Sequence, residues 1–308
     1  MWIREPQKVS EEIEYLGTTD MCIYLLKGRE YMFIEGGMSY VVPTLLHQLD
    51  QRGIDQSKIT KFLILHSHFD HCGIVPFFKK RLPQMEVLAS ARTKEVYGKD
   101  RAIHFIRERN RAMIDYYGME REATELNLDF EAIPVDRVVR EGERVDLGDG
   151  LIAECIDVPG HSSCSIAAYV GKMKALFASD AAGIPNERGT IYPIGNENFI
   201  QFQHSLARLN QYDVEILCAA RNGVFQGKDG RGFISKTMRA AEKLRQEVIK
   251  RVAETGSRER VITELCDRIY AEIKTVDIPK GIFLRVIKSI VENIVDGDTP
   301  QQGGEKII

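Results

Sequence analysis

The sequence predicts an α/β fold that is followed by a helical C-terminal part. Short apolar runs broken by glycine fill the first third of the chain and return after residue 150, a pattern typical of strands. The mostly apolar run over 59–65 has the composition of a strand buried on both faces. After about residue 233 these runs stop, and amphipathic helical spacing takes their place.

The strands are predicted in two groups, one on each side of a charged helical segment. They cover 13–16, 21–26, 31–34, 59–65 and 85–89 in the first group, and 151–158, 165–170, 175–178 and 214–219 in the second. Gly171 and Lys172 predict a hairpin turn between two strands of the second group. Residues 42–51 have helical spacing and predict a helix between two strands of the first group.

Helical patterns account for the remaining long segments. A charged stretch with helical apolar period begins at Arg92, and we expect a helical insertion over about 92–130. Three amphipathic helices are predicted near the C-terminus, over 235–253, from the N-cap residue Ser257, and after Pro279. The predicted organisation is therefore a main domain over 1–232 and a helical extension over 233–308.

Composition excludes several classes of protein. The chain has 308 residues, of which 44% are hydrophobic, and a formal net charge of -3, so it can bury a core and is not built to bind duplex nucleic acid. It has no apolar run long enough to span a membrane and no secretory signal pattern. Its six cysteines are scattered without a Cys-x-x-Cys pair. We expect a cytoplasmic protein without nucleic-acid or membrane partners.

One segment directly after the buried strand is rich in metal-ligating side chains. It reads Leu65-His66-Ser67-His68-Phe69-Asp70-His71-Cys72-Gly73. Alternation in extended chain turns His66 and His68 the same way, so both imidazoles can bind one cation, while Asp70 and His71 can face a second position. The alternative is a polar loop with coincidental histidines, but only 7 of 308 residues are histidine, which makes such a cluster rare by chance.

Two later residues fit the same site. His161 follows a predicted strand and a Pro-Gly turn, and Asp180 follows another predicted strand. Imidazole and carboxylate ligands suit zinc, iron or manganese, and the lack of thiolates is not typical of a closed structural zinc site. Each residue alone would be weak evidence for a metal site, since a histidine in a loop often has no functional role and an aspartate after a strand is often a helix cap.

These motifs resemble the metallo-β-lactamase superfamily of hydrolases over about residues 10–225. The resemblance implies a four-layer αββα sandwich with a metal site between the sheet edges, here with a helical insertion and a C-terminal helical extension. It also implies that His66, His68 and His161 hold one divalent ion, that Asp70 and His71 hold a second, and that Asp180 bridges the two.

The chain departs from the family pattern at the last expected ligand. The family supplies a histidine after a final strand, and here Asn222 occupies the expected place in Ala220-Arg221-Asn222-Gly223. An amide oxygen is a weaker ligand than imidazole for a transition metal. We expect one or two ions, zinc or iron with manganese also accepted, a weakened second position, and no other cofactor.

A finer resemblance is to the family of quinolone-signal response thioesterases, which cleave aminobenzoylacetyl-CoA. It rests on the run from His66 through Phe78 and on the segments at 81–83 and 87–93. That family has the same sandwich with a helical C-terminal extension. The resemblance implies that the insertion over 92–125 and the terminal helices roof the metal site and form an apolar acyl pocket; the alternative use of these helices is core packing or a homodimer face.

The expected reaction is hydrolysis of a small-molecule acyl substrate by a metal-bound hydroxide that Asp70, the expected catalytic residue, orients. No separate general acid is evident, which favours a thioester, because a thiol with a pKa of about 8.5 yields a good leaving group. The alternatives are a lactone or phosphodiester hydrolase, and a non-catalytic or regulatory ligand-binding member. Flavin-linked diiron members carry a carboxylate where this chain has His68 and an appended flavodoxin domain, and neither feature is present here.

Overall fold

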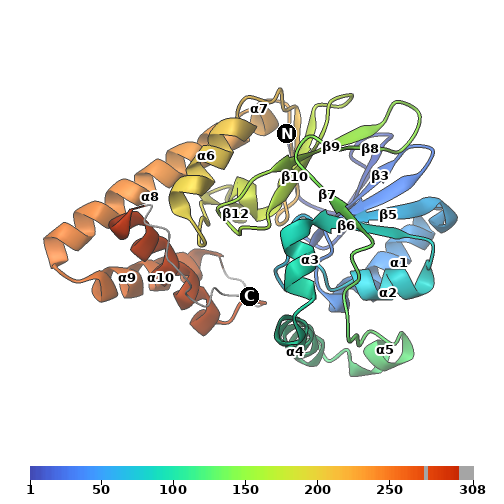
Figure 1. Cartoon of the computed structure of the whole chain (residues 1–308), viewed down its shortest axis with the longest axis horizontal. Helices are drawn as coiled ribbons and strands as arrows, with labels where there is room; N and C mark the ends of the chain where they lie inside the picture. The colour runs from blue at the N-terminus through green and yellow to red at the C-terminus, as the bar shows by residue number, and fades with distance from the viewer. Residues whose placement is uncertain (274–276, 298–308) are drawn as a thin grey trace.

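The computed structural model describes residues 1–273 and 277–297 and contains two β-sheets packed face to face (Figure 1). One buried apolar cluster fills the space between the sheets. Two further clusters lie between each sheet and the helices on its outer face. The layers are therefore helices, sheet, sheet and helices, which confirms the predicted four-layer sandwich.

The first sheet is built from the N-terminal half of the chain. Its order is β2 (Ile13–Gly17), β3 (Cys22–Lys27), β4 (Tyr31–Ile34), β5 (Ile59–Leu63), β6 (Glu86–Ser90) and β7 (Arg137–Val139). Strands β2 to β4 pair antiparallel, whereas β4 to β7 pair parallel. The carboxyl ends of β4 and β5 consequently meet at one edge of the sheet.

The second sheet comes mostly from the later half of the chain. Its order is β1 (Trp2–Ile3), β15 (Val224–Gln226), β14 (Ile216–Cys218), β11 (Ala175–Phe177), β10 (Ile166–Val170), β9 (Ile152–Asp157) and β8 (Arg144–Asp146). Because β10 is antiparallel to both β9 and β11, and β11 is parallel to β14, the strands β9, β11 and β14 run in one direction. Their carboxyl ends lie at the same edge. A separate short hairpin joins β12 (Ile184–Pro185) and β13 (Ile191–Tyr192).

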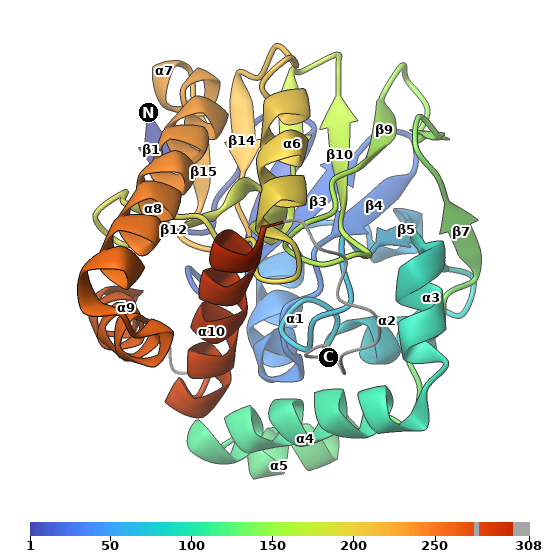
Figure 2. The same ribbon diagram turned by 60° about the vertical axis from the view of Figure 1, so that its left-hand side comes forward.

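Helices from the first half cover the first sheet. They are α1 (Val42–Gln51), α2 (Val75–Arg81), α3 (Ala91–Tyr97), α4 (Asp100–Tyr116) and α5 (Glu120–Glu125). Short 3-10 turns, η1 (Ser39–Val41) and η2 (Gln56–Lys58), precede α1 and β5. The predicted helical insertion therefore consists of α3, α4 and α5, and α4 and α5 lie across one end of the molecule (Figure 2).

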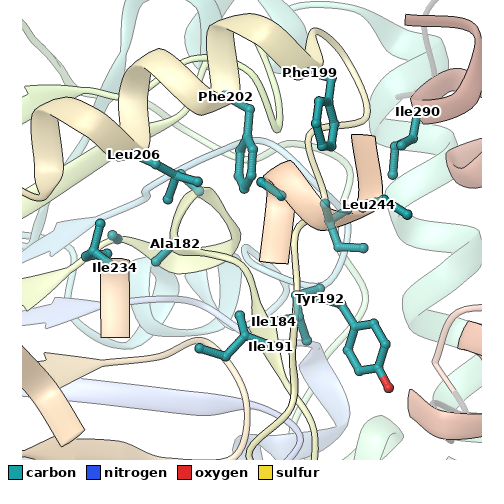
Figure 3. Packing of buried hydrophobic residues seen from close by; sticks show 14 of the residues in the cluster. Ala182, Ile184, Ile191, Tyr192, Phe199, Phe202, Leu206, Ile234, Leu244 and Ile290 are labelled. Carbon is teal, nitrogen blue, oxygen red and sulfur yellow. The ribbon is translucent and has the colours of Figure 1, made fainter. Parts of the chain in front are cut away.

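Helices from the second half cover the second sheet. They are α6 (Phe199–Leu209), α7 (Lys228–Arg231), α8 (Phe233–Thr255), α9 (Arg258–Ile273) and α10 (Lys280–Asp296), with a 3-10 turn η3 (Ser179–Ala182) after β11. Helix α10 packs against α9, α8 and α6 (Figure 2). Phe199, Phe202 and Leu206 of α6 share one buried cluster with Leu244 of α8 and Ile290 of α10 (Figure 3).

The three predicted C-terminal helices are present as α8, α9 and α10. They share their buried cluster with α6 and with the second sheet, so they extend the core of the sandwich. The division at residue 232 into two domains stays a prediction, and residues 298–308 of the predicted extension lie outside the described residues. None of the described helices has the length and apolar content needed to cross a bilayer.

Candidate metal centre

The candidate site lies where strand ends of the two sheets meet. His66 follows β5 of the first sheet, and Glu35 directly follows the parallel neighbour β4. His161 follows β9, Asp180 lies in η3 after β11, and Arg221 follows β14, the three strands of the second sheet that run in one direction. Side chains from five separate stretches are therefore brought to one place by sheet topology.

Three imidazoles converge at this place. The Nδ1 atom of His68 lies 3.1 Å from Nε2 of His66 and 3.0 Å from Nε2 of His161. A tetrahedral ion with bonds of about 2.1 Å separates its ligand nitrogens by roughly 3.4 Å, so the group needs little adjustment to hold one. His66, His68 and His161 thus fit one divalent ion, as the sequence predicts; that they bind it stays a prediction.

The protonation state of this group suits metal binding. Burial, assisted by the neighbouring imidazoles, holds the pKa of His66 well below its usual range and lowers the pKa of His68 to about 3. Both rings are neutral at pH 7, which is the form that coordinates metal. On the far side of the third ring, Nδ1 of His161 lies 2.8 Å from the carbonyl oxygen of Ile194, a contact of the kind that orients metal-binding histidines.

A second group overlaps the first. It combines His66 with His71 and Asp180, whose Oδ2 lies 3.4 Å from Nε2 of His71 and 3.5 Å from Nε2 of His161. Nε2 of His71 and Oδ1 of Asp180 are buried and have no hydrogen-bond partner within the described parts of the chain. Buried unpaired atoms of this kind need a specific explanation, and a bound ion is one of those that a site of this composition allows.

The charge on His71 depends on three carboxylates. Burial disfavours the charged ring, but Asp70, Glu35 and Asp180 together outweigh burial and hold the pKa of His71 well above its usual value. Nδ1 of His71 lies 2.6 Å from Oε2 of Glu35, the carboxylate contact that often supports a metal-binding histidine. Although burial raises the pKa of Asp180, His71 more than offsets this and lowers it.

Asp70 forms a buried ion pair with Arg221. Nη2 of Arg221 donates to Oδ2 of Asp70 at 2.5 Å and to Oδ2 of Asp277 at 2.7 Å, while Nη1 donates to Oδ1 of Asp277 at 3.3 Å. Burial opposes both charges, yet His71 and Arg221 lower the pKa of Asp70, and Asp277 and Asp70 raise the pKa of Arg221. Asp70 belongs to neither metal-ligand group among the described residues, and its lowered pKa keeps it ionised at neutral pH.

Asn222, the residue expected at the place of the missing ligand, is held by contacts outside the two metal-ligand groups. Its backbone has a φ of 60°, its amide nitrogen donates to the carbonyl oxygen of Pro185 at 2.8 Å, and its own carbonyl accepts from the indole of Trp2. The turn between β14 and β15 therefore directs Arg221, and not Asn222, toward Asp70. Asn tolerates the left-handed backbone that this turn requires.

A small apolar cavity opens onto the three-imidazole group. It measures about 60 Å³, and its lining includes His68, Phe69, Asp70, His161 and Asp180, together with Ile184, Ile194, Asn196, Ile278, Ile282, Phe283 and Val286. Three of these residues belong to α10, so the terminal helix forms part of the wall, as expected. The insertion over 92–125 contributes none of the described lining residues, which corrects the expectation that it shares in the pocket.

The remaining histidines lie elsewhere. His47, His104 and His204 are found on α1, α4 and α6, away from the three-imidazole group. Sequence reasoning missed Glu35, Arg221 and Asp277. For Glu35 a usable signal existed, because a carboxylate directly after a strand that pairs in parallel with the His66 strand must reach the same sheet edge.

Comparison with known protein families assigns the chain to one family. The family model described as "Metallo-beta-lactamase superfamily" matches residues 22–221, about two thirds of the chain. The chain belongs to the metallo-β-lactamase superfamily, and its fold is of the metal-dependent hydrolase type. The predicted family is thereby confirmed.

Solved structures share this fold at low sequence identity. A metallo-β-lactamase family protein from Thermus thermophilus is 17% identical, with 92% of this chain and 93% of that chain covered and a TM-score of 0.65. A subclass B3 metallo-β-lactamase of Bradyrhizobium japonicum is 21% identical, with 81% and 94% covered and a TM-score of 0.55. Rubredoxin oxygen:oxidoreductase from Desulfovibrio gigas is 16% identical, with 93% and 75% covered and a TM-score of 0.58. At these identities the likeness concerns the fold alone.

The neutral imidazoles give a prediction for the stability of the metal-free protein. His66 and His68 have lowered pKa values when folded, but in the unfolded chain they take up protons near pH 6.5. Below that pH the unfolded state binds two more protons than the folded state, so the free energy of unfolding should fall by about 2–3 kcal/mol per pH unit. His71, with its raised pKa, is protonated in both states there and adds no slope.

Urea unfolding of the metal-free protein between pH 7 and pH 5 measures this slope. The variant His68→Asn should reduce it by about half, because one of the two protons is removed. A free energy of unfolding that stays constant over this range would contradict the neutral state of the two rings.

Proposed function

We propose that the protein is a metal-dependent hydrolase that cleaves thioesters of small apolar acyl groups. The observation that carries this proposal is the cavity in which the imidazole group meets an apolar wall from α10 and the β12–β13 region. Such a cavity supports a substrate whose reacting carbonyl lies at the metal centre and whose acyl chain lies against the isoleucines of the wall.

The proposed roles of the side chains follow from their positions. His66, His68, His161 and Asp180 would hold the divalent ion, which when bound lowers the pKa of water from about 15.7 to near 7 and so supplies a nucleophile at neutral pH. Asp70 lines the cavity and is kept ionised by His71 and Arg221, so it would accept a hydrogen bond and orient the attacking water. An ionised Asp70 is not suited to donate a proton to the leaving group.

The leaving group must therefore depart without acid assistance from the wall. Among the described residues that line the cavity, the only titratable side chains are His68, Asp70, His161 and Asp180, all of them already part of the site. A thiolate departs readily because its conjugate acid has a pKa of about 8.5, whereas an amine from an amide needs a proton. This supports a thioester ahead of an amide; a lactone is the next least demanding substrate.

The size of the cavity supports a short acyl group. Its volume of about 60 Å³ is far below the roughly 300–1,000 Å³ of pockets that enclose drug-sized ligands. The acyl end of the substrate would occupy the cavity, and the larger leaving group would extend from it toward solvent.

One observation favours a second candidate function, a non-catalytic ligand-binding member. Arg221 reaches Asp70 where the family has a histidine ligand, so the site departs from a complete two-metal arrangement. A binding protein would retain the cavity and the first metal position without turnover.

Turnover assays separate the two candidates. The protein is loaded in turn with zinc, iron and manganese and assayed with acyl-CoA thioesters from acetyl to octanoyl, a γ-lactone and bis(p-nitrophenyl) phosphate. We expect hydrolysis of the short acyl-CoA thioesters and none by His161→Ala. Full metal occupancy with no turnover of any of these substrates would contradict the hydrolase proposal and leave the binding function.

Filling the cavity should reduce thioester turnover without disturbing the metal. Val286→Trp on α10 places an indole in the cavity, and we expect kcat/KM for butanoyl-CoA to fall by about tenfold or more, with metal content unchanged. Leu284→Trp, on the exposed side of the same helix, is the matched control and should leave turnover unchanged. Equal effects of the two substitutions would show that this cavity does not hold the acyl group.

A further inference from the structure

We propose that the guanidinium of Arg221 takes the place of a second metal ion, so that the protein holds one ion, at the three-imidazole group. This inference rests on the metal site of the proposed function. It concerns the residues around His71 and Asp70, which do not fit a second ion.

The positive charge of Arg221 already lies beside the Asp70 oxygen that a second ion would bind. Nη2 of Arg221 lies 2.5 Å from Oδ2 of Asp70, the same oxygen that faces Nε2 of His71 at 3.4 Å. An ion bound to this oxygen at about 2.1 Å would lie within roughly 5 Å of the guanidinium nitrogen. The place is buried, where two positive charges repel each other far more strongly than in water.

Too few side chains are left to bind a second ion, because His66 and Asp70 are engaged elsewhere. Nε2 of His66 lies 3.1 Å from Nδ1 of His68 and belongs to the three-imidazole group, while its Nδ1 lies 3.4 Å from the hydroxyl of Ser179. A second ion would then keep only His71 and the Asp180 carboxylate that it shares with the first ion, because Oδ2 of Asp70 accepts from Arg221. Protein metal sites of this class use at least three protein ligands.

Several hydrogen bonds besides the one to Asp70 hold Arg221 in this position. Asp277, shortly before α10, binds both terminal nitrogens of the guanidinium, and Nη1 also donates to the backbone oxygen of Asp20 at 3.1 Å. Arg109 of α4 donates to the backbone oxygen of Asp277 at 3.1 Å, so α4 and the C-terminal helices both support this pair. Arginine keeps its charge at all physiological pH values and, unlike a metal ion, does not exchange with solution.

Arg221 is accordingly a positioning residue. It fixes Oδ2 of Asp70 by a hydrogen bond of 2.5 Å, in the place of a second ion. The ion pair with Asp277 makes the geometry of Asp70 depend on the packing of helix α10, which follows Asp277 in the chain.

Counting bound ions tests the inference. Purified protein is loaded with zinc, freed of excess metal, and analysed by elemental analysis and native mass spectrometry. We expect one ion per chain for the wild type and two for Arg221→His/Asp277→Asn, in which an imidazole replaces the guanidinium and its partner carboxylate is neutralised. Asn222→His is the matched control, because that side chain faces Pro185, and it should keep one ion.

A second readout needs no variant. Electron paramagnetic resonance of the cobalt-loaded wild type should show isolated high-spin Co²⁺, without the coupling of two neighbouring ions. Two ions per wild-type chain, a coupled cobalt spectrum, or a double variant that folds and still binds one ion would each overturn the inference. Failure of the proposed function is distinguishable, since it would appear as no bound ion or as one ion without turnover.

Discussion

Replacing His161 with alanine is expected to remove the bound ion and all metal-dependent turnover. Nε2 of His161 lies 3.0 Å from Nδ1 of His68, and the ring comes from the second sheet, whereas His66 and His68 come from the first. Its loss leaves two imidazoles on one loop. Because removal of a partner outside the ligand shell already costs about 10–100-fold in metal affinity, loss of a ligand should weaken zinc binding by at least about a hundredfold.

Chelator competition measures the affinity, and elemental analysis measures the content. His204→Ala, on α6 and away from the three-imidazole group, is the matched histidine control and should bind zinc like the wild type. If His161→Ala retained wild-type affinity while folded, the ion would have to bind at a place other than the three-imidazole group.

Replacing Arg221 with methionine is expected to cause a large loss of stability. The guanidinium is buried between Asp70 and Asp277, and methionine would leave both carboxylates buried without their shared cation. Breaking a buried ion pair by removing one partner costs about 3–5 kcal/mol. We expect a decrease of this size in the free energy of unfolding, measured by urea denaturation of the metal-free protein.

A surface pair provides the comparison. Arg121→Met removes an exposed i,i+4 pair with Glu125 on α5 and should cost about 0.5 kcal/mol or less. Adding Asp277→Asn to Arg221→Met neutralises one of the two carboxylates that have lost the guanidinium, and it should restore part of the lost stability. An Arg221→Met protein as stable as Arg121→Met would contradict the buried network that joins Asp70 to the C-terminal helices.

The regular elements were predictable where local pattern decides the structure. The helix over 42–51 has the predicted bounds, and the helix after Ser257 begins at Arg258. No bounds were predicted for helix α6, although Asn198 caps its first turn. The two-residue strands β1, β12 and β13 have no sequence pattern of their own, since tertiary pairing forms them.

The residues of the site also fall into those that the local sequence predicts and those that only tertiary packing brings together. His66, His68, Asp70 and His71 lie in one short segment, so residue spacing alone indicates a metal site. Asp277 is far from Asp70 in sequence, and no local pattern connects them; only the packing of α10 brings them together through Arg221. The prediction considered Asn222 at this turn and gave no role to Arg221, because the conformation of the β14–β15 turn, and not the spacing, decides which side chain reaches Asp70.

The most direct test of the central claim is a crystal structure of the zinc-loaded protein with anomalous data collected on both sides of the zinc edge. We expect one anomalous peak, bonded at about 2.1 Å to Nε2 of His66, Nδ1 of His68 and Nε2 of His161. Zinc bound at full occupancy anywhere else, with these three nitrogens uncoordinated, would contradict the account of the site and the function built on it.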